Sequence, residues 1–283
     1  MTDAGRGGFE IRVMSRAELD MVVGWARDEG WNPGTHDAPA FHATDPEGFL
    51  LGALDGEPIA SISVVRYGAT FGFLGLYIVI PAARGRGFGI QMWRAGMARL
   101  SGRLVGLDGV PAQQDNYRKS GFSLAYGNVR YGGAAPAGGA AGLHDARDVP
   151  FDRLAALDAR LFPAARHGFL AGWISLPESR ALVALEDGEV IGFGVRRRAA
   201  VGHRIGPLYG HSRAVAERLL LGLSDGIAGD EIFVDVPQAN PSAVALAEDL
   251  GLGPAFDTAR MYTAEPPALD LARVFGVSTL ELG

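Results

Sequence analysis

The sequence predicts an α+β fold, an α/β sandwich, in which two similar domains follow one another, each a mixed, mostly antiparallel sheet flanked by helices. Three observations predict it. A buried β-run at residues 71–80 leads into a glycine-rich turn and a helical pattern. Asp55-Gly56 and Asp187-Gly188, both strong hairpin signals, occupy comparable places in the two halves. Residues 132–142 are almost entirely Gly, Ala and Pro, a composition typical of a linker.

The composition is that of an ordinary soluble globular protein. With 283 residues, 48% hydrophobic and 20% charged, the chain is long enough for two domains with real cores. A net charge of −6 argues against nucleic-acid binding. The absence of cysteine excludes disulfides, thiolate metal sites and an acyl-cysteine intermediate. Nothing indicates a metal, a leader segment or a membrane span, so we expect a cytoplasmic protein.

The first half, residues 1–131, shows helix and strand signals in an order that places a crossover helix between two parallel strands. Ser15 and Glu18 form a capping box that starts a helix running to about residue 29. The irregular segment 30–37 is expected either as a surface loop or as a wall of a substrate pocket. The strands expected are 9–14, 49–54, 58–67, 71–80, 104–107 and 123–131, and the further helices are 41–45, 90–100 and 113–120.

The second half, residues 143–283, repeats this plan. Asn240 is an expected helix N-cap with Pro241 at the first helical position. Gly251-Leu252 takes the place that Gly121-Phe122 holds in the first half. The helices expected are 151–162, 212–223 and 241–250, and the strands are 180–186, 190–196, 204–209 and 231–236. Two copies of one domain explain this order most simply.

The segment from Arg84 to Gly89 has the features of a phosphate-binding loop. It follows a buried strand and precedes a helix, so free main-chain N–H groups and the helix dipole would favour an anion. A Walker A loop would need Gly-Lys followed by Ser or Thr, which is absent. A dinucleotide loop would need a different glycine spacing near the start of a βαβ unit. An arginine-bearing turn without a ligand is the remaining alternative.

Two motifs give the first half a family resemblance. Arg84-x-x-Gly87-x-Gly89 and Tyr117-x-x-x-Gly121-Phe122, each after a strand, resemble the GNAT superfamily of N-acetyltransferases over residues 9–131, just under half of the chain. The stretch Glu29-Gly30-Trp31-Asn32-Pro33-Gly34 and the tandem layout resemble a bacterial subgroup with a divergent second GNAT-like domain. The resemblance implies transfer of an acetyl group from acetyl-CoA to a primary amine of a small molecule, by direct attack in a ternary complex.

The resemblance also implies roles for individual residues. The loop would hold the pyrophosphate of acetyl-CoA, and the edge of the preceding strand would pair with the pantetheine arm, with a main-chain N–H near Val79 polarising the thioester carbonyl. Tyr117 would protonate the leaving thiolate. Asn116 would bond the cofactor or serve as an ordinary cap. The cofactor-binding residues expected are Ile78, Val79, Ile80, Arg84, Gly85, Arg86, Gly87, Phe88, Gly89 and Asn116.

A general base is harder to assign, although an alkyl ammonium must lose a proton before it attacks. Asp108, at the end of a strand next to the expected gap, is the first choice. His36, Asp37, Glu29 and a chain of water molecules are alternatives. The residues expected to contact the acceptor are Glu29, Trp31, Asn32 and His36.

The sequence departs from the family pattern in three places. Val110 stands where many members have an asparagine, and in the second half Ala247 stands where the tyrosine should be. The second loop, 206–212, lacks the glycine spacing and contains Pro207, which has no N–H. We therefore expect the second domain to have no full CoA site and to shape the acceptor pocket or supply a packing surface. Polar residues that could face that pocket are Asp235, Asn240, Asp257 and Arg260.

Two other functions remain compatible with the sequence. One is an acyl-CoA-binding sensor without turnover, and the other is a structural protein that keeps only the fold. Retention of Tyr117 beside an intact loop favours the enzyme. The identity of the amine is not encoded in any motif, and a homodimer is compatible with the composition.

Overall fold

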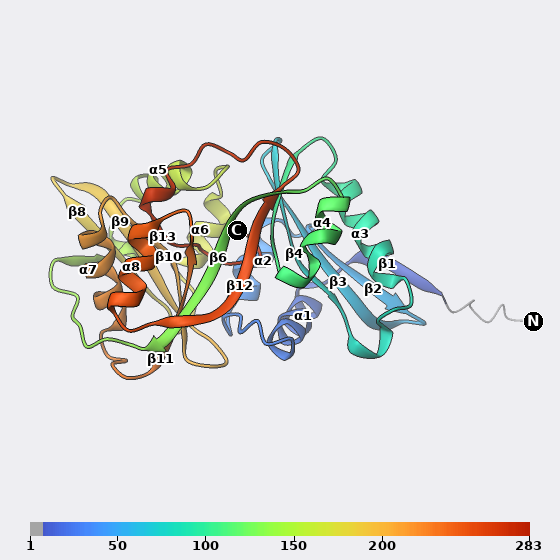
Figure 1. The fold of residues 1–283 in the computed structure, drawn as a ribbon, viewed down its shortest axis with the longest axis horizontal. Helices are drawn as coiled ribbons and strands as arrows, with labels where there is room; N and C mark the ends of the chain where they lie inside the picture. Colours follow the sequence, from blue (N-terminus) through green and yellow to red (C-terminus); the bar gives the residue numbers. More distant parts are fainter. Residues whose placement is uncertain (1–7) are drawn as a thin grey trace, which may run out of the picture.

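The computed structural model describes residues 8–283, so the first seven residues of the predicted first domain lie outside it. The two halves lie side by side along the long axis of the molecule, with helices on both faces of the strands (Figure 1). All strands within residues 8–283 belong to one continuous 13-stranded sheet. Its order is β1-β2-β3-β4-β5-β12-β6-β11-β10-β9-β8-β7, with β13 paired to β10.

The first half contains the predicted elements with shifts of a few residues at their ends. A short helix begins at Asp37 rather than at residue 41, and the helix after the glycine loop begins at Phe88 rather than at residue 90. The elements are β1 (Phe9–Val13), α1 (Arg16–Asp28), α2 (Asp37–Thr44), β2 (Phe49–Leu54), β3 (Glu57–Tyr67), β4 (Phe71–Val79), α3 (Phe88–Arg99), β5 (Leu104–Gly109), α4 (Gln114–Lys119) and β6 (Ser123–Ala134).

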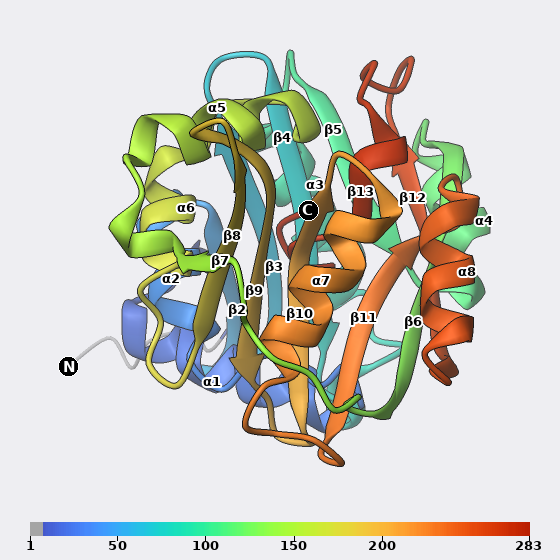
Figure 2. The ribbon, with the colours of Figure 1, turned by 90° about the vertical axis from the view of Figure 1, so that its left-hand side faces the viewer.

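The second half repeats this order element by element, which confirms the predicted tandem fold. In Figure 2 α7 lies in front of β10. α7 packs against β8, β9 and β10, as α3 packs against β2, β3 and β4 in the first half. The elements are β7 (Leu143–Asp145), α5 (Phe151–Leu161), α6 (His167–Trp173), β8 (Arg180–Glu186), β9 (Glu189–Arg198), β10 (His203–Gly210), α7 (Arg213–Ser224), β11 (Glu231–Pro237), α8 (Pro241–Asp249), β12 (Gly253–Tyr262) and β13 (Val274–Gly276). Sequence patterns did not indicate β7, α6, β12 or β13.

Two corresponding strands, β6 of the first half and β12 of the second, each pair with strands of the other half. β6 pairs with β11, and β12 is inserted between β5 and β6. The predicted linker at 132–142 is therefore wrong in its first three residues, because Gly132 to Ala134 still pair with β11. A Cβ at Gly132 would lie 2.7 Å from the ring of Phe233, so this glycine is required by packing rather than by flexibility.

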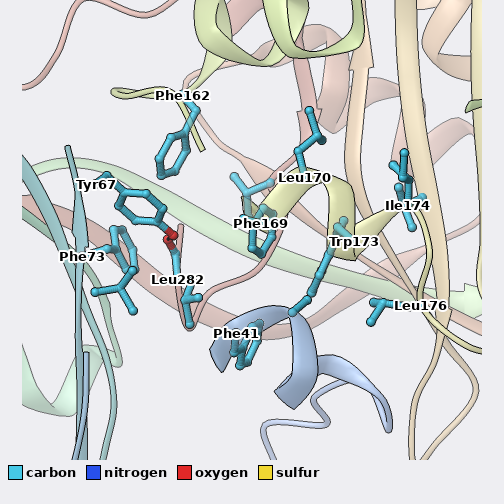
Figure 3. Close-up of a cluster of buried hydrophobic side chains, with 14 of the residues drawn as sticks. Phe41, Tyr67, Phe73, Phe162, Phe169, Leu170, Trp173, Ile174, Leu176 and Leu282 are labelled. Atoms are coloured by element: carbon cyan, nitrogen blue, oxygen red, sulfur yellow. Dashed lines mark hydrogen bonds between the residues drawn. The ribbon is translucent and has the colours of Figure 1, made fainter. Parts of the chain in front are cut away.

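Three buried clusters hold the sheet and helices together. One lies under α3 and a second under α7, and each also includes residues of the strand that the other half contributes, β12 in the first case and β6 in the second. The third covers the opposite face and combines residues of both halves, among them Phe41, Tyr67, Phe162 and Trp173 (Figure 3). The rings of Tyr67 and Phe162 meet edge to face at 4.9 Å. Burial of such side chains stabilises the fold by roughly 1.5–3 kcal/mol each, so the halves share one core.

Among residues 8–283, no helix is both long enough and apolar enough to cross a membrane.

Candidate functional site

The site begins where β4 separates from β5. The two parallel strands pair only from Phe71 to Leu74 on β4, opposite Leu104 to Leu107 on β5. On the other side of β4 the register with β3 shifts between Ser61 and Ser63, and Leu76 has a φ of 43°. The hydroxyl of Ser61 donates to the carbonyl of Leu76 at 2.7 Å and stabilises this bulge. The bulge turns the second half of β4 away from β5.

A cavity of about 520 Å³ lies at this separation. It is lined by the second half of β4, the glycine loop and Tyr117. Residues from other segments of both halves of the chain also line it, including Trp31, Arg130 and Phe256. A single cavity therefore connects the predicted cofactor loop to a second region built partly by β6 and β12.

The glycine loop offers free donors to an anion. Gly85 and Gly87 have φ values of 74° and 82°, a region that glycine occupies without strain, and Gly87 is the N-cap of α3. Within the described residues, the N–H groups of Gly85, Arg86 and Gly87 donate to no main-chain acceptor. Together with the unpaired N–H groups of the first turn of α3, they form a site suited to a phosphate.

Tyr117 lies on α4 at the cavity wall and is only 9% exposed. Its ring stacks on Trp93 with centroids 5.5 Å apart. A Cβ at Gly109 would lie 2.4 Å from the Tyr117 ring, so the glycine on β5 makes room for the tyrosine. Burial, with a smaller contribution from Tyr77, raises the pKa of Tyr117 to about 12. The phenol is therefore protonated at neutral pH and is suited to donate a proton.

Most of the predicted cofactor residues line the cavity. Those that do are Ile78, Val79, Arg84, Gly85, Phe88 and Gly89. Ile80, Arg86, Gly87 and Asn116 do not. The N–H of Ile80 donates to Ile59 at 3.0 Å, and the Asn116 amide donates to Gln113 at 2.8 Å, as an ordinary surface bond.

Asp108 lines the cavity but its carboxylate is already engaged. Arg260 donates to its two oxygens at 2.8 and 2.7 Å, and Asn128 donates to Oδ1 at 2.8 Å. Burial raises the pKa of Asp108, and the charge of Arg260 opposes this effect. Because Arg260 is on β12 and Asp108 on β5, the pair joins the exchanged strand to the first half. The geometry favours this anchoring role over the predicted role as general base.

Two of the four predicted acceptor residues are at the cavity and two are not. Glu29 and Trp31 line it, and Glu29 also forms an ion pair with Arg84 of the loop. Asn32 instead makes two hydrogen bonds to the main chain of Val201, at 2.9 and 3.0 Å. His36 is 4.0 Å from Glu178 and does not line the cavity.

The alternative base Asp37 is also removed from the cavity. It is buried, forms an ion pair with Arg197, and accepts from the N–H of Gly34 at 2.9 Å. Its role is to join the early loop to β9 of the second half.

Sequence reasoning missed the residues that β6, β12 and the last segment bring to the cavity. Arg130 binds Asp235 through two hydrogen bonds, at 2.7 and 3.3 Å, and its guanidinium lies 5.3 Å from the centre of the Phe256 ring. Only the strand exchange brings these residues to the site, and no sequence signal indicated it. The lining residues that come from β6, β12 and the last segment are Arg130, Phe256, Thr258, Leu280 and Glu281, and Val110 and Gln113 come from the connection between β5 and α4.

The polar residues suggested for the second domain lie behind this wall. Burial opposes ionisation of Asp235, but Arg130 and Arg204 hold its pKa below the ordinary value. Arg260 binds Asp108, and Asn240 caps α8 by accepting from Ser242 and Ala243 at 3.1 and 3.2 Å. None of them, nor Asp257, lines the cavity.

The equivalent position in the second half is filled by the chain itself. β10 pairs with β11 only from His203 to Ile205, as β4 pairs with β5 only at its start. Beyond this point β13 pairs with β10, at Leu208 and Tyr209. The N–H of Leu252 bonds to the carbonyl of Ala247 at 3.0 Å, which matches the bond from Phe122 to Tyr117 at 3.1 Å. Ala247 is therefore the structural counterpart of the tyrosine.

Comparisons with known proteins agree with this architecture. A model of the acetyltransferase (GNAT) family matches residues 16–122, and a model of an acetyltransferase (GNAT) domain matches residues 154–276. A holothin acyltransferase of Pseudoalteromonas sp. (strain SANK 73390) is 32% identical over 281 residues, which cover 95% of this chain and 92% of that protein.

Solved structures share the fold. One from Pyrococcus horikoshii, assigned as an acetyltransferase, superposes with a TM-score of 0.83 at 22% identity, covering 100% of this chain and 99% of that one. A tandem GNAT protein from the clavulanic acid biosynthesis pathway has a TM-score of 0.61 at 15% identity, covering 92% and 99%. The sequence relative spans nearly the whole chain and both halves match GNAT models. The chain thus belongs to the GNAT family, as an acyltransferase with two GNAT domains in tandem.

Proposed function

We propose that the protein is an N-acetyltransferase that moves the acetyl group of acetyl-CoA to a primary amine of a small molecule. The observation that carries the proposal is the cavity that joins the open end of β4, the glycine loop and the buried Tyr117. GNAT proteins generally use an acyl-CoA donor, and the residues at this end of the cavity have the chemistry that such a donor requires.

The donor would bind along β4 and the loop. The main-chain groups of β4 beyond Leu74 have no partner strand on the β5 side, so the amide-containing pantetheine arm fits there as an added strand. The pyrophosphate then meets the N–H groups of Gly85 to Gly87 and the N-terminus of α3. A main-chain N–H near Val79 is suited to stabilise charge on the thioester oxygen.

The transfer itself would be direct. The amine nitrogen attacks the thioester carbonyl while both substrates are bound, the C–N bond forms and the C–S bond breaks. Tyr117 gives its hydroxyl proton to the departing sulfur. Since no cysteine is present, no acyl-cysteine intermediate can form. Holding the two reactants in one cavity supplies much of the rate enhancement, as in other reactions between positioned groups.

The acceptor end of the cavity favours a small molecule. Its walls carry the aromatic side chains of Trp31 and Phe256 and few free polar groups, and the whole cavity is about 520 Å³. That volume is typical of a small-ligand site. Since the similar protein of Pseudoalteromonas is named for holothin, holothin is the first acceptor to test.

Calorimetry with acetyl-CoA and a thiol-release assay test the proposal. The assay would use holothin, tyramine, putrescine and glucosamine as acceptors. We expect one acetyl-CoA to bind per chain and at least one of these amines to release free CoA, with mass spectrometry showing an added acetyl group on the amine. Binding without release on any of them would favour the sensor, and no binding would contradict both.

A further inference from the structure

The charged side chains that line the cavity differ in whether they are already paired. Glu29 binds Arg84, Asp108 binds Arg260, and Arg130 binds Asp235. Within the described residues, Glu281 is the one charged side chain lining the cavity that forms no ion pair. Its carboxylate accepts one side-chain hydrogen bond, from the hydroxyl of Thr279.

Three buried arginines, Arg130, Arg197 and Arg204, are held by other acids. Arg204 on β10 feels the charge of Glu281 but its guanidinium bonds to Asp235. Arg130 on β6 shares the same aspartate, and Arg197 on β9 is paired with Asp37. The carboxylate of Glu281 is therefore available to a cationic group that enters the cavity.

The main chain of Glu281 is fixed at the start of the gap between β4 and β5. A Cβ at Gly75 would lie 2.0 Å from the carbonyl oxygen of Glu281, so the two main chains are in direct contact one residue after β4 leaves β5. Glu281 is 4% exposed and Gly75 has no side chain to separate them. This places residue 281 beside the strand segment along which the donor would bind.

The segment on either side of Glu281 is held rigidly. Tyr67 donates to the carbonyl of Leu282 at 2.9 Å, and the Leu282 side chain lies in the aromatic cluster shared by the halves (Figure 3). Arg166 donates to the hydroxyl of Ser278 at 2.7 Å and to the carbonyl of Gly283 at 3.0 Å. A carboxylate on so fixed a segment is ordered before substrate binds, which favours catalysis.

We infer that Glu281 binds the acceptor amine and accepts its proton, an inference that rests on the proposed function. The bound ammonium gives one proton to the Glu281 carboxylate, directly or through one water molecule, and the free amine then attacks the thioester carbonyl. The C–N bond forms, the C–S bond breaks and Tyr117 protonates the sulfur. The nitrogen loses its second proton through solvent, which restores the Tyr117 hydroxyl, and Glu281 releases its proton to solvent, so both groups regain their starting forms and one proton is released per turnover.

Glu281→Gln tests the inference, with Glu47→Gln as the control, because Glu47 does not line the cavity and is paired with Arg66. The acceptor is the amine of the panel that the parent protein turns over fastest. We expect Glu281→Gln to lower kcat by about 100-fold at pH 7, as for loss of a general base. The affinity for acetyl-CoA should stay within about twofold of the parent value, and the denaturant midpoint within about 10%. Both should hold because glutamine has the shape of glutamate and keeps the hydrogen bond to Thr279.

The pH profile separates a base from a structural residue. In Glu281→Gln the rate should follow the fraction of free amine and increase about tenfold per pH unit, reducing the deficit at high pH. Glu281→Asp, which keeps a carboxylate, should recover part of the rate and the shape of the parent profile. It also provides the test if the glutamine variant does not fold.

Parent-like turnover and profile in Glu281→Gln, or an equal loss in Glu47→Gln, would overturn the inference. So would an aspartate variant with no recovery. A parent protein that turns over none of the amines would instead refute the proposed function, which separates the two failures.

Discussion

The two halves of the molecule contain the same strand separation but use it differently. In the first half β4 leaves β5 after Leu74 and a cavity remains. In the second half β10 leaves β11 after Ile205, and β13 pairs with the vacated edge. The backbone of the chain thus takes, in one half, the place that the pantetheine arm is proposed to take in the other. The comparison teaches that a separated pair of strands is an open pairing edge, which either a ligand or the chain can satisfy.

The filled half still contributes to the open one. The segment that follows β13 passes to the first half and brings Leu280 and Glu281 to its cavity. The exchange of β6 and β12 brings Arg130 and Phe256 there as well. The second domain has therefore become part of the wall of the first domain's site.

The largest effect on turnover is expected at Tyr117, which is present in the first half and replaced by Ala247 in the second. Tyr117→Phe removes the proposed proton donor, whose counterpart is Ala247, and should lower kcat by about 10²- to 10⁴-fold. The affinity for acetyl-CoA should not change, since the ring still stacks on Trp93. Tyr131→Phe, at a buried tyrosine that does not line the cavity, is the control.

The pH dependence adds a second readout for Tyr117. Its raised pKa of about 12 keeps the acid protonated, so the parent should lose no rate on its account until the pH rises toward that value. Parent-like turnover in Tyr117→Phe would refute the assignment, and an equal loss in Tyr131→Phe would show a packing effect.

The next largest effect is on stability and concerns β12, the strand that the second half inserts into the first. Asp108→Asn leaves the buried Arg260 without its charge partner and should lower the free energy of unfolding by about 3–5 kcal/mol. Asp145→Asn removes the partly exposed pair with Arg147 and should cost no more than about 1 kcal/mol. Urea denaturation of both variants makes the comparison. If the two variants had equal free energies of unfolding, the Asp108–Arg260 pair would not anchor β12.

A smaller effect compares the two helix starts. Gly87→Ala puts a side chain at a φ of 82°, which should cost about 1–2 kcal/mol of conformational strain. If the loop changes its conformation to relieve this strain, acetyl-CoA should bind roughly 10-fold more weakly. Ser212→Ala removes the N-cap of α7 and should lower stability by about 1 kcal/mol while leaving acetyl-CoA affinity unchanged. Calorimetry and denaturation distinguish them. A similar loss of acetyl-CoA affinity in both variants would contradict the proposal that only the loop before α3, and not the loop before α7, binds the cofactor.

Local sequence patterns were sufficient for most of the elements. The capping box at Ser15 and Glu18 is formed as predicted, and the Asp55-Gly56 and Asp187-Gly188 turns connect hairpins. These features depend on residues close in sequence, so hydrophobic periodicity and turn chemistry identify them. The tandem α+β fold follows from their order.

Long-range pairing could not be read in the same way. Gly132 and Gly133 looked like linker because nothing local shows that β11 pairs with them. The partner of Asp108 is 152 residues away, and the contact of Glu281 with Gly75 joins the last segment of the chain to a strand of the first half. A motif finds the loop and Tyr117, but the acceptor wall arises from strand exchange, which only tertiary structure reveals.

Hydrogen exchange with and without acetyl-CoA tests the central claim most directly, because it reports on both strand separations in one experiment. We predict that acetyl-CoA slows exchange at the amides of residues 76–89 and leaves those of residues 206–212 unchanged, since β13 already pairs with β10 there. Slowed exchange at 206–212, or none at 76–89, would contradict the account.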